Sequence, residues 1–225
     1  MAMDTRAVIF DLDGTLVDSE PAYYEAGRQL LARYGVDGYS WEHHARFVGI
    51  GTEETLAALR AEYRIAAPVQ ELLAGKNRIY LELAGRTVRA FPGMRELVER
   101  LRAAGVPMAV ASGSSPRAIR AVLAGTGLDG AFALTVSAEQ VEHGKPAPDV
   151  FLAAAERLGV APERCVVLED AAPGVTAAAR AGMRCVAVPY LPEQADDPAF
   201  ASADLLFPGG QREFDAARTY AWIMS

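Results

Sequence analysis

Short apolar runs alternate with segments of helical period over most of the chain. After residue 91, apolar runs predict strands at residues 106–111, 132–136, 165–168 and 185–188. Helices are predicted near residues 116–124, 148–158 and 173–181, and another carries Met94, Leu97, Val98 and Leu101 on one face. Short apolar strands that alternate with helices are typical of a parallel sheet covered on both faces.

One further apolar strand begins at Val8, and the residues after it follow a different pattern. No convincing strand occurs over residues 18–86. Pro21 opens a helix that Gly35 ends, Thr52 is expected to be the N-cap of a second helix, and a third covers about residues 69–83. This stretch predicts an all-helical module inserted after the first strand.

The alternation therefore predicts two parts. They are an α/β core of residues 1–17 and 88–225 and a helical module of residues 18–87. Hinges between them are expected near residues 17–20 and 85–90. The polar run 192–198 is expected to be an exposed loop.

Composition narrows the class of protein. A chain of 225 residues with 51% hydrophobic residues is long enough for one large domain, or a domain with an inserted module, and for a substantial core. The net charge of -7 and the pI near 5.1 argue against a general nucleic-acid binder, because such proteins carry basic stripes. The negative charge of any bound phosphate must therefore be balanced by groups at the binding site itself.

The sequence shows no sign of a membrane or metal-thiolate protein. Its N-terminus lacks a signal-peptide pattern and no apolar run approaches the roughly 20 residues that span a bilayer, so we expect no membrane partner and a cytoplasmic location. Cys165 and Cys185 each begin an apolar segment, which suits buried strand thiols without a chemical role. The histidines form no ligand cluster with them, so zinc has no support.

The first strand delivers two carboxylates, Asp11 and Asp13, into a turn at Gly14. Acidic side chains are rarely buried without a partner, so this pair indicates a nearby cation, and Mg²⁺ is the natural candidate. The alternative is a strand followed by an ordinary Asp-Gly turn.

A second strand end carries hydroxyl groups. The segment Ser112-Gly113-Ser114-Ser115 stands just before the helix opened by Pro116. Hydroxyls, a glycine that lets the backbone approach, and a helix N-terminus suit an anion such as phosphate. An ordinary N-cap before a proline is the alternative.

Two more segments carry charged residues after predicted strands. Lys145 stands between a glycine and a proline, and it is either a counter-charge to phosphate or a solvated surface charge. Glu169 and Asp170 end another apolar run, although Asp170 alternatively caps the helix after Pro173.

Ligands of parallel sheets bind beyond the carboxyl ends of the strands, so these groups are expected to share one site. Their chemistry suits phosphoryl transfer. Asp11 is the predicted nucleophile and Asp13 the predicted general acid and base. Mg²⁺ is expected on Asp11, the backbone carbonyl of Asp13, and Asp170, while Ser112 and Lys145 hold phosphate oxygens.

These residues carry a family resemblance. Asp11-Leu12-Asp13-Gly14-Thr15, Ser112, Lys145 and Glu169-Asp170 closely resemble the four motifs of the haloacid dehalogenase superfamily, and the helical insert resembles the cap of its β-phosphoglucomutase-like subfamily. The resemblance covers nearly the whole chain. It implies a Rossmann-like parallel-sheet core with an all-helical cap after the first strand, the site roles given above, and a supporting role for Glu169 behind the metal ligands. Dehalogenases of the superfamily lack the second aspartate, so Asp13 speaks against dehalogenation.

The cap positions separate two activities. β-Phosphoglucomutases carry a His where this chain has Tyr23, and an Arg that grips a second phosphate where it has Thr52. Lys76 matches a cap lysine of the subfamily, and these three residues are the candidates for substrate selection. Both mutase residues are missing, so the favoured activity is Mg²⁺-dependent hydrolysis of a small phosphate monoester, of sugar phosphate or nucleoside monophosphate type. A sugar phosphate mutase is the alternative.

A third possibility is a non-catalytic protein that binds a phosphometabolite. Intact acid and base positions serve no purpose in passive binding, which argues against it. The expected partner is a small phosphorylated metabolite, and we expect a monomer or a weak homodimer.

Overall fold

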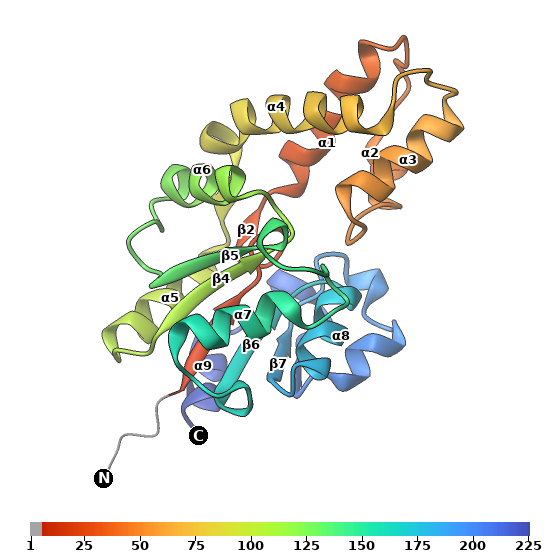
Figure 1. Ribbon diagram of the computed structural model, residues 1–225. Coiled ribbons are helices and arrows are strands. Elements are labelled where there is room, and N and C mark those ends of the chain that lie inside the picture. Colours follow the sequence, from red (N-terminus) through yellow and green to blue (C-terminus); the bar gives the residue numbers. More distant parts are fainter. Residues whose placement is uncertain (1–5) are drawn as a thin grey trace.

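The computed structural model describes residues 6–225, which include a six-stranded sheet with helices on both faces (Figure 1). The strand order is β5-β4-β1-β6-β7-β8, and each neighbouring pair is parallel. The strands are β1 (Ala7–Phe10), β4 (Met108–Ser112), β5 (Leu134–Ser137), β6 (Cys165–Glu169), β7 (Arg184–Ala187) and β8 (Leu205–Leu206). The predicted α/β class with a parallel sheet is confirmed. Residues 1–5, which belong to the predicted core segment and to the N-terminus read for a signal peptide, lie outside the described residues.

β1 lies at the centre of the sheet and is fully buried. Val8 and Phe10 belong to one apolar cluster, whereas Ala7 and Ile9 belong to another. Successive side chains of a strand point to opposite faces, so one short strand supplies both halves of the core. This explains why β1 reads as an unbroken apolar run, and it places the residues that follow Phe10 at the edge of the buried sheet.

Helices cover the two faces of the sheet. α7 (Asp149–Leu158) and α8 (Ala172–Arg180) bury Phe151 and Val175 in the cluster that contains Ile9. The other face is covered by α5 (Pro92–Ala103), α6 (Pro116–Thr126) and α9 (Ala216–Met224), which contribute to the cluster of Phe10. The helices predicted near 116–124, 148–158 and 173–181 are thus found within a few residues of their expected bounds.

Four helices lie between two short paired strands. β2 (Val17–Asp18) and β3 (Arg89–Ala90) are antiparallel, with Val17 opposite Ala90. Between them lie α1 (Glu20–Ala32), α2 (Trp41–Ala45), α3 (Thr52–Glu62) and α4 (Val69–Thr87). Figure 1 shows these helices beyond one end of the large sheet. The chain therefore leaves and re-enters the core at one place.

The observed helices and strands differ from the predicted ones at a few points. α2 was not predicted, because a helix of 5 residues is too short to show a period; Ser40 caps it by accepting from the His43 N–H. The N-cap of α3 is Gly51, and Thr52 is instead its first residue. α4 extends to Thr87, beyond the expected end near residue 83. β8 and α9 were also missed.

The two cysteines lie where the apolar runs predicted them. Cys165 and Cys185 are free and buried, in β6 and β7. Over the described part of the chain, no helix is both long and apolar enough to cross a membrane.

Candidate active site

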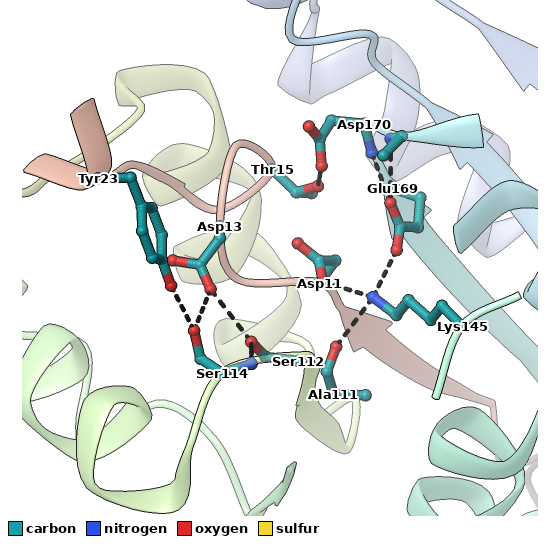
Figure 2. A network of polar contacts seen from close by, with 11 residues as sticks. Asp11, Asp13, Thr15, Tyr23, Ala111, Ser112, Ser114, Lys145, Glu169 and Asp170 are labelled. Atoms are coloured by element: carbon teal, nitrogen blue, oxygen red, sulfur yellow. Dashed lines mark hydrogen bonds and ion pairs between the residues drawn. The ribbon is translucent and has the colours of Figure 1, made fainter. Parts of the chain in front are cut away.

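The carboxyl ends of β1, β4 and β6 lie side by side and carry most of the predicted site residues (Figure 2). Asp11 directly follows β1, Ser112 is the last residue of β4, and Glu169 is the last residue of β6. Asp170 comes next, and Lys145 reaches the same place from the segment between β5 and α7. Neighbouring strands thus bring together residues that are far apart in the sequence.

Lys145 bridges two of these carboxylates. Its Nζ lies 2.5 Å from Asp11 Oδ1 and 2.5 Å from Glu169 Oε1. Burial alone would lower the pKa of Lys145, but the Asp11 and Glu169 carboxylates raise it above its ordinary value. The amine therefore stays protonated and is a fixed positive charge beside Asp11. It is well placed to meet an anionic oxygen.

Asp11, Glu169 and Asp170 form a buried group of carboxylates. Each offers one oxygen atom, and these atoms lie within 4.8 Å of one another. Burial raises the pKa of Asp170 well above its usual range, and the charges of Glu169 and Asp11 raise it further. Burial likewise raises the pKa of Asp11, although Lys145 opposes this. When ionised, the three carboxylates carry more negative charge than the single positive charge of Lys145 can balance. Hard oxygen donors of this kind suit a divalent cation.

The free oxygen atoms distinguish the members of this group. Glu169 Oε2 accepts from the N–H groups of Asp170, at 2.9 Å, and Ala171, at 3.1 Å, while Oε1 accepts from Lys145. Asp170 Oδ1 accepts from the Thr15 hydroxyl at 2.7 Å, which leaves Oδ2 without a hydrogen bond from the described residues. Glu169 is therefore occupied in orienting its neighbours, which supports the interpretation that it lies behind the metal ligands.

Glu169 also depends on a glycine. A Cβ atom at Gly174, in the first turn of α8, would overlap the Glu169 carboxylate. Gly174 does not have a positive φ, so its conformation suits any residue and only the space forbids a side chain. The close approach of α8 thus helps to hold Glu169 against Lys145.

We expect Gly174→Ala to destabilise the protein by about 1–3 kcal/mol, since the added methyl group must displace a buried side chain. Gly85→Ala is the matched control: it also lies in a helix, and nothing lies within 4 Å of its added Cβ. There, alanine should stabilise the fold by about 0.5–1 kcal/mol. Thermal unfolding of both variants measures the difference, and a stabilised Gly174→Ala would contradict the packing described.

Asp13 has a separate environment. Its Oδ2 accepts from the hydroxyls of Ser114, at 2.7 Å, and Ser112, at 3.2 Å, and its Oδ1 accepts from the Tyr80 hydroxyl at 3.3 Å. Because Ser114 gives its only hydroxyl proton to Asp13, the Tyr23 hydroxyl, 2.7 Å away, donates to Ser114 (Figure 2). Burial raises the pKa of Asp13 although the Ser114 hydrogen bond opposes this.

The side chain of Asp13 is not part of the carboxylate group formed by Asp11, Glu169 and Asp170. Its expected contribution to metal binding therefore remains the backbone carbonyl. A carboxyl group with a raised pKa, held by neutral hydroxyls, holds a proton more readily than an ordinary aspartate, which suits a group that both gives and takes a proton.

These groups line a cavity of about 660 Å³ between the core and the inserted helices. The predicted phosphate binders Gly113 and Lys145 line it from the core. Tyr23, Thr52 and Lys76, the predicted selectivity positions, line it from the inserted helices. Ser112 is buried beside the cavity, and its hydroxyl is bonded to Asp13.

Three residues that touch the predicted groups were given no role of their own from the sequence. Thr15 bonds to Asp170, and Ser114 and Tyr80 bond to Asp13. Ser114 lies in the hydroxyl-rich segment that had drawn attention to Ser112. Tyr80 lies four residues after Lys76 on α4, a spacing that puts two side chains on one face of a helix.

The chain matches the family model described as hydrolase, haloacid dehalogenase-like hydrolase, over residues 5–182. It is 35% identical over 182 residues to a phosphorylated carbohydrates phosphatase from Thermotoga maritima, covering 79% of this chain and 82% of the relative. It is 33% identical over 191 residues to a bifunctional riboflavin kinase/FMN phosphatase from Arabidopsis thaliana, covering 84% of this chain but only 50% of that relative.

Among solved structures, CbbY from Rhodobacter sphaeroides in complex with phosphate is similar, with a TM-score of 0.79 and 28% identity, over 93% of this chain and 96% of CbbY. These similarities agree with the order of the strands and with the residues at their carboxyl ends: all of them indicate the same family. The chain belongs to the haloacid dehalogenase-like hydrolase family.

Proposed function

We propose that this protein is a Mg²⁺-dependent phosphatase that hydrolyses small phosphate monoesters, of sugar phosphate or nucleoside monophosphate type, through an aspartyl-phosphate. The observation that carries the proposal is the grouping of Asp11 with Lys145 and with the carboxylates of Glu169 and Asp170, together with Asp13 two residues further along the chain. The similarity to a phosphatase of phosphorylated carbohydrates supports the substrate class.

In the first step Asp11 is the nucleophile. One carboxylate oxygen forms a bond to phosphorus as the bond between phosphorus and the leaving oxygen breaks. Asp13 gives its proton to that leaving oxygen, so that a neutral alcohol departs. Lys145 and the Gly113 N–H are proposed to hold the oxygens of the transferring phosphoryl group, joined by the Ser112 hydroxyl if it turns from Asp13, to which it donates in this structure.

In the second step Asp13 acts as the base. Its carboxylate takes a proton from a water molecule, whose oxygen then bonds to phosphorus while the bond to Asp11 breaks. Phosphate and a free Asp11 result. The hydrogen bonds from Ser114 and Tyr80 keep Asp13 oriented in both protonation states.

Asp11, the Asp13 carbonyl and Asp170 are proposed to hold Mg²⁺, with Glu169 orienting them from behind. When bound, the ion neutralises charge on the phosphoryl oxygens and keeps the carboxylates ionised. Their raised pKa values without an ion are the reason to expect this coupling.

We also propose that residues 18–87 act as a cap domain on the core of residues 1–17 and 88–225. The paired strands β2 and β3 are the hinge, since they make both connections between the two parts. Closure would exclude water during the first step and select what enters the cavity. Tyr23, Thr52 and Lys76 are the cap residues proposed to contact the substrate.

Removing the metal tests the proposal. We expect EDTA to reduce hydrolysis of p-nitrophenyl phosphate by about a hundredfold or more, and added Mg²⁺ to restore it. Release of p-nitrophenol measures the rate. A rate that EDTA leaves unchanged would rule out the metal assignment, and the absence of any phosphate ester hydrolysis with Mg²⁺ would rule out the phosphatase.

A further inference from the structure

The cap side of the cavity contains a lysine without a hydrogen-bonding partner. Lys76, on α4, is 5% exposed, and its Nζ lies 5.2 Å from the centre of the Tyr23 ring. It makes no hydrogen bond or ion pair with another of residues 6–225. Burial lowers the pKa of Lys76 to about 8, although the Glu20 carboxylate opposes this. The Lys76 side chain lines the cavity and its amine has no acceptor from the described residues, so this amine is available to a ligand that accepts hydrogen bonds.

Glu20 lines the same cavity and is held in place from behind. Its Oε2 lies 2.9 Å from His44 Nε2, and His44 Nδ1 lies 3.1 Å from the Tyr39 hydroxyl. His44 is 4% exposed and Tyr39 is 3% exposed, so this chain of contacts is buried. Glu20 Oε1 accepts no hydrogen bond within the described part of the chain. Both side chains line the cavity and the Glu20 charge raises the pKa of Lys76, so the wall offers an acceptor in addition to this donor.

This wall lies on the side of the proposed leaving group. Tyr23, next to Lys76, is linked through Ser114 to Asp13 (Figure 2). Tyr80 stacks on Tyr23, with ring centres 4.1 Å apart, and bonds directly to Asp13. Asp13 is the proposed proton donor to the leaving oxygen. The part of the substrate beyond that oxygen therefore meets the tyrosine pair and then the wall formed by Lys76 and Glu20.

The charges of this wall do not suit a second phosphate group. Lys76 and Lys145 are the only lysines or arginines among the described residues that line the cavity, and Lys145 already bridges two carboxylates. Glu20, Glu53 and Glu54 line the cap side. A phosphate monoester carries a charge of about −1.5 to −2 near neutral pH, so it would meet Lys76 alone, beside carboxylates. Hydroxyl groups, in contrast, can donate to Glu20 and accept from Lys76.

We propose that Glu20 and Lys76 bind hydroxyl groups of the leaving alcohol, so that the site selects monophosphates of neutral polyhydroxy compounds and rejects the same compounds when they carry a second phosphate. This inference rests on the proposed phosphatase function. His44 is a positioning residue, which holds the Glu20 carboxylate at the wall. A mutase that passes through a sugar bisphosphate does not fit this wall.

Fructose 1-phosphate and fructose 1,6-bisphosphate form a pair that differs by one phosphate. With Mg²⁺, we expect kcat/KM of the unmodified protein to favour the monophosphate by about tenfold or more, and Glu20→Gln to reduce this preference at least about threefold. Glutamine keeps the shape of the side chain and removes its charge. Lys76→Met should raise KM for fructose 1-phosphate by about tenfold, because a charged donor to the substrate is lost.

Glu25→Gln is the matched control, because Glu25 lies on the same helix but bonds to Arg28 and does not line the cavity. It should leave the preference unchanged. Equal use of the two fructose esters, or an unchanged preference in Glu20→Gln, would overturn the inference. It would also be overturned if p-nitrophenyl phosphate were hydrolysed while fructose 1-phosphate and glucitol 6-phosphate were not. That result would leave the proposed phosphatase function standing. If no ester were hydrolysed, both the phosphatase function and this inference would be ruled out.

Discussion

Asp11→Asn is expected to lower kcat for p-nitrophenyl phosphate by about a thousandfold or more, because an amide cannot serve as the nucleophile. Asparagine has nearly the same shape as aspartate. Burial and Glu169 disfavour the Asp11 charge that it removes, and Lys145, which favours that charge, keeps its ion pair with Glu169. The variant should therefore fold. Steady-state kinetics and thermal unfolding measure the two effects, and acid-quenched samples should contain no phosphorylated protein.

Asp129→Asn is a suitable control for this variant, since Asp129 is exposed and does not line the cavity. Its activity should match that of the unmodified protein. Substantial turnover by Asp11→Asn would mean that another group attacks phosphorus, and the aspartyl-phosphate would have to be abandoned.

Asp13→Asn should separate the two steps of the reaction. p-Nitrophenolate leaves without protonation, so the first step continues and releases about one equivalent of product per site in a burst. The second step needs a base, and steady-state turnover should fall by about a hundredfold or more. Rapid-quench measurement of p-nitrophenol shows both phases.

The same variant makes a further distinction with a sugar phosphate. A poor leaving group needs the proton that asparagine cannot give, so the burst should disappear together with turnover. A burst of equal size with both esters would show that Asp13 does not protonate the leaving oxygen. Unchanged steady-state rates would show that it is not the base.

The parallel sheet and its buried centre were predictable from local patterns. Continuous apolar runs between helix-period segments leave few arrangements other than a sheet covered on both faces. The strand containing Val8 and the strand beginning at Cys165 pair directly, with Val8 opposite Val166. The elements that the sequence did not predict include short ones such as α2 and β8, which have too few residues to show a helix or strand period.

The grouping of the predicted site residues followed from the same argument. Carboxyl ends of neighbouring parallel strands must meet at one edge, and β1 lies between β4 and β6. Asp11, Ser112 and Asp170 are therefore expected at one place from the sequence alone. Their chemical roles stay predictions, for which the two aspartate variants are the tests.

The pattern of apolar and polar residues along the chain was enough to predict the parallel sheet and the strand ends at which Asp11, Ser112 and Asp170 meet, because strand ends are arranged by backbone hydrogen bonding, which follows simple rules. The cap side of the cavity could not be read in this way. Tyr80 reaches Asp13, and His44 holds Glu20, only because four helices pack in one particular way between β2 and β3. Such packing depends on how many side chains fit together at once, and no spacing in the sequence records it.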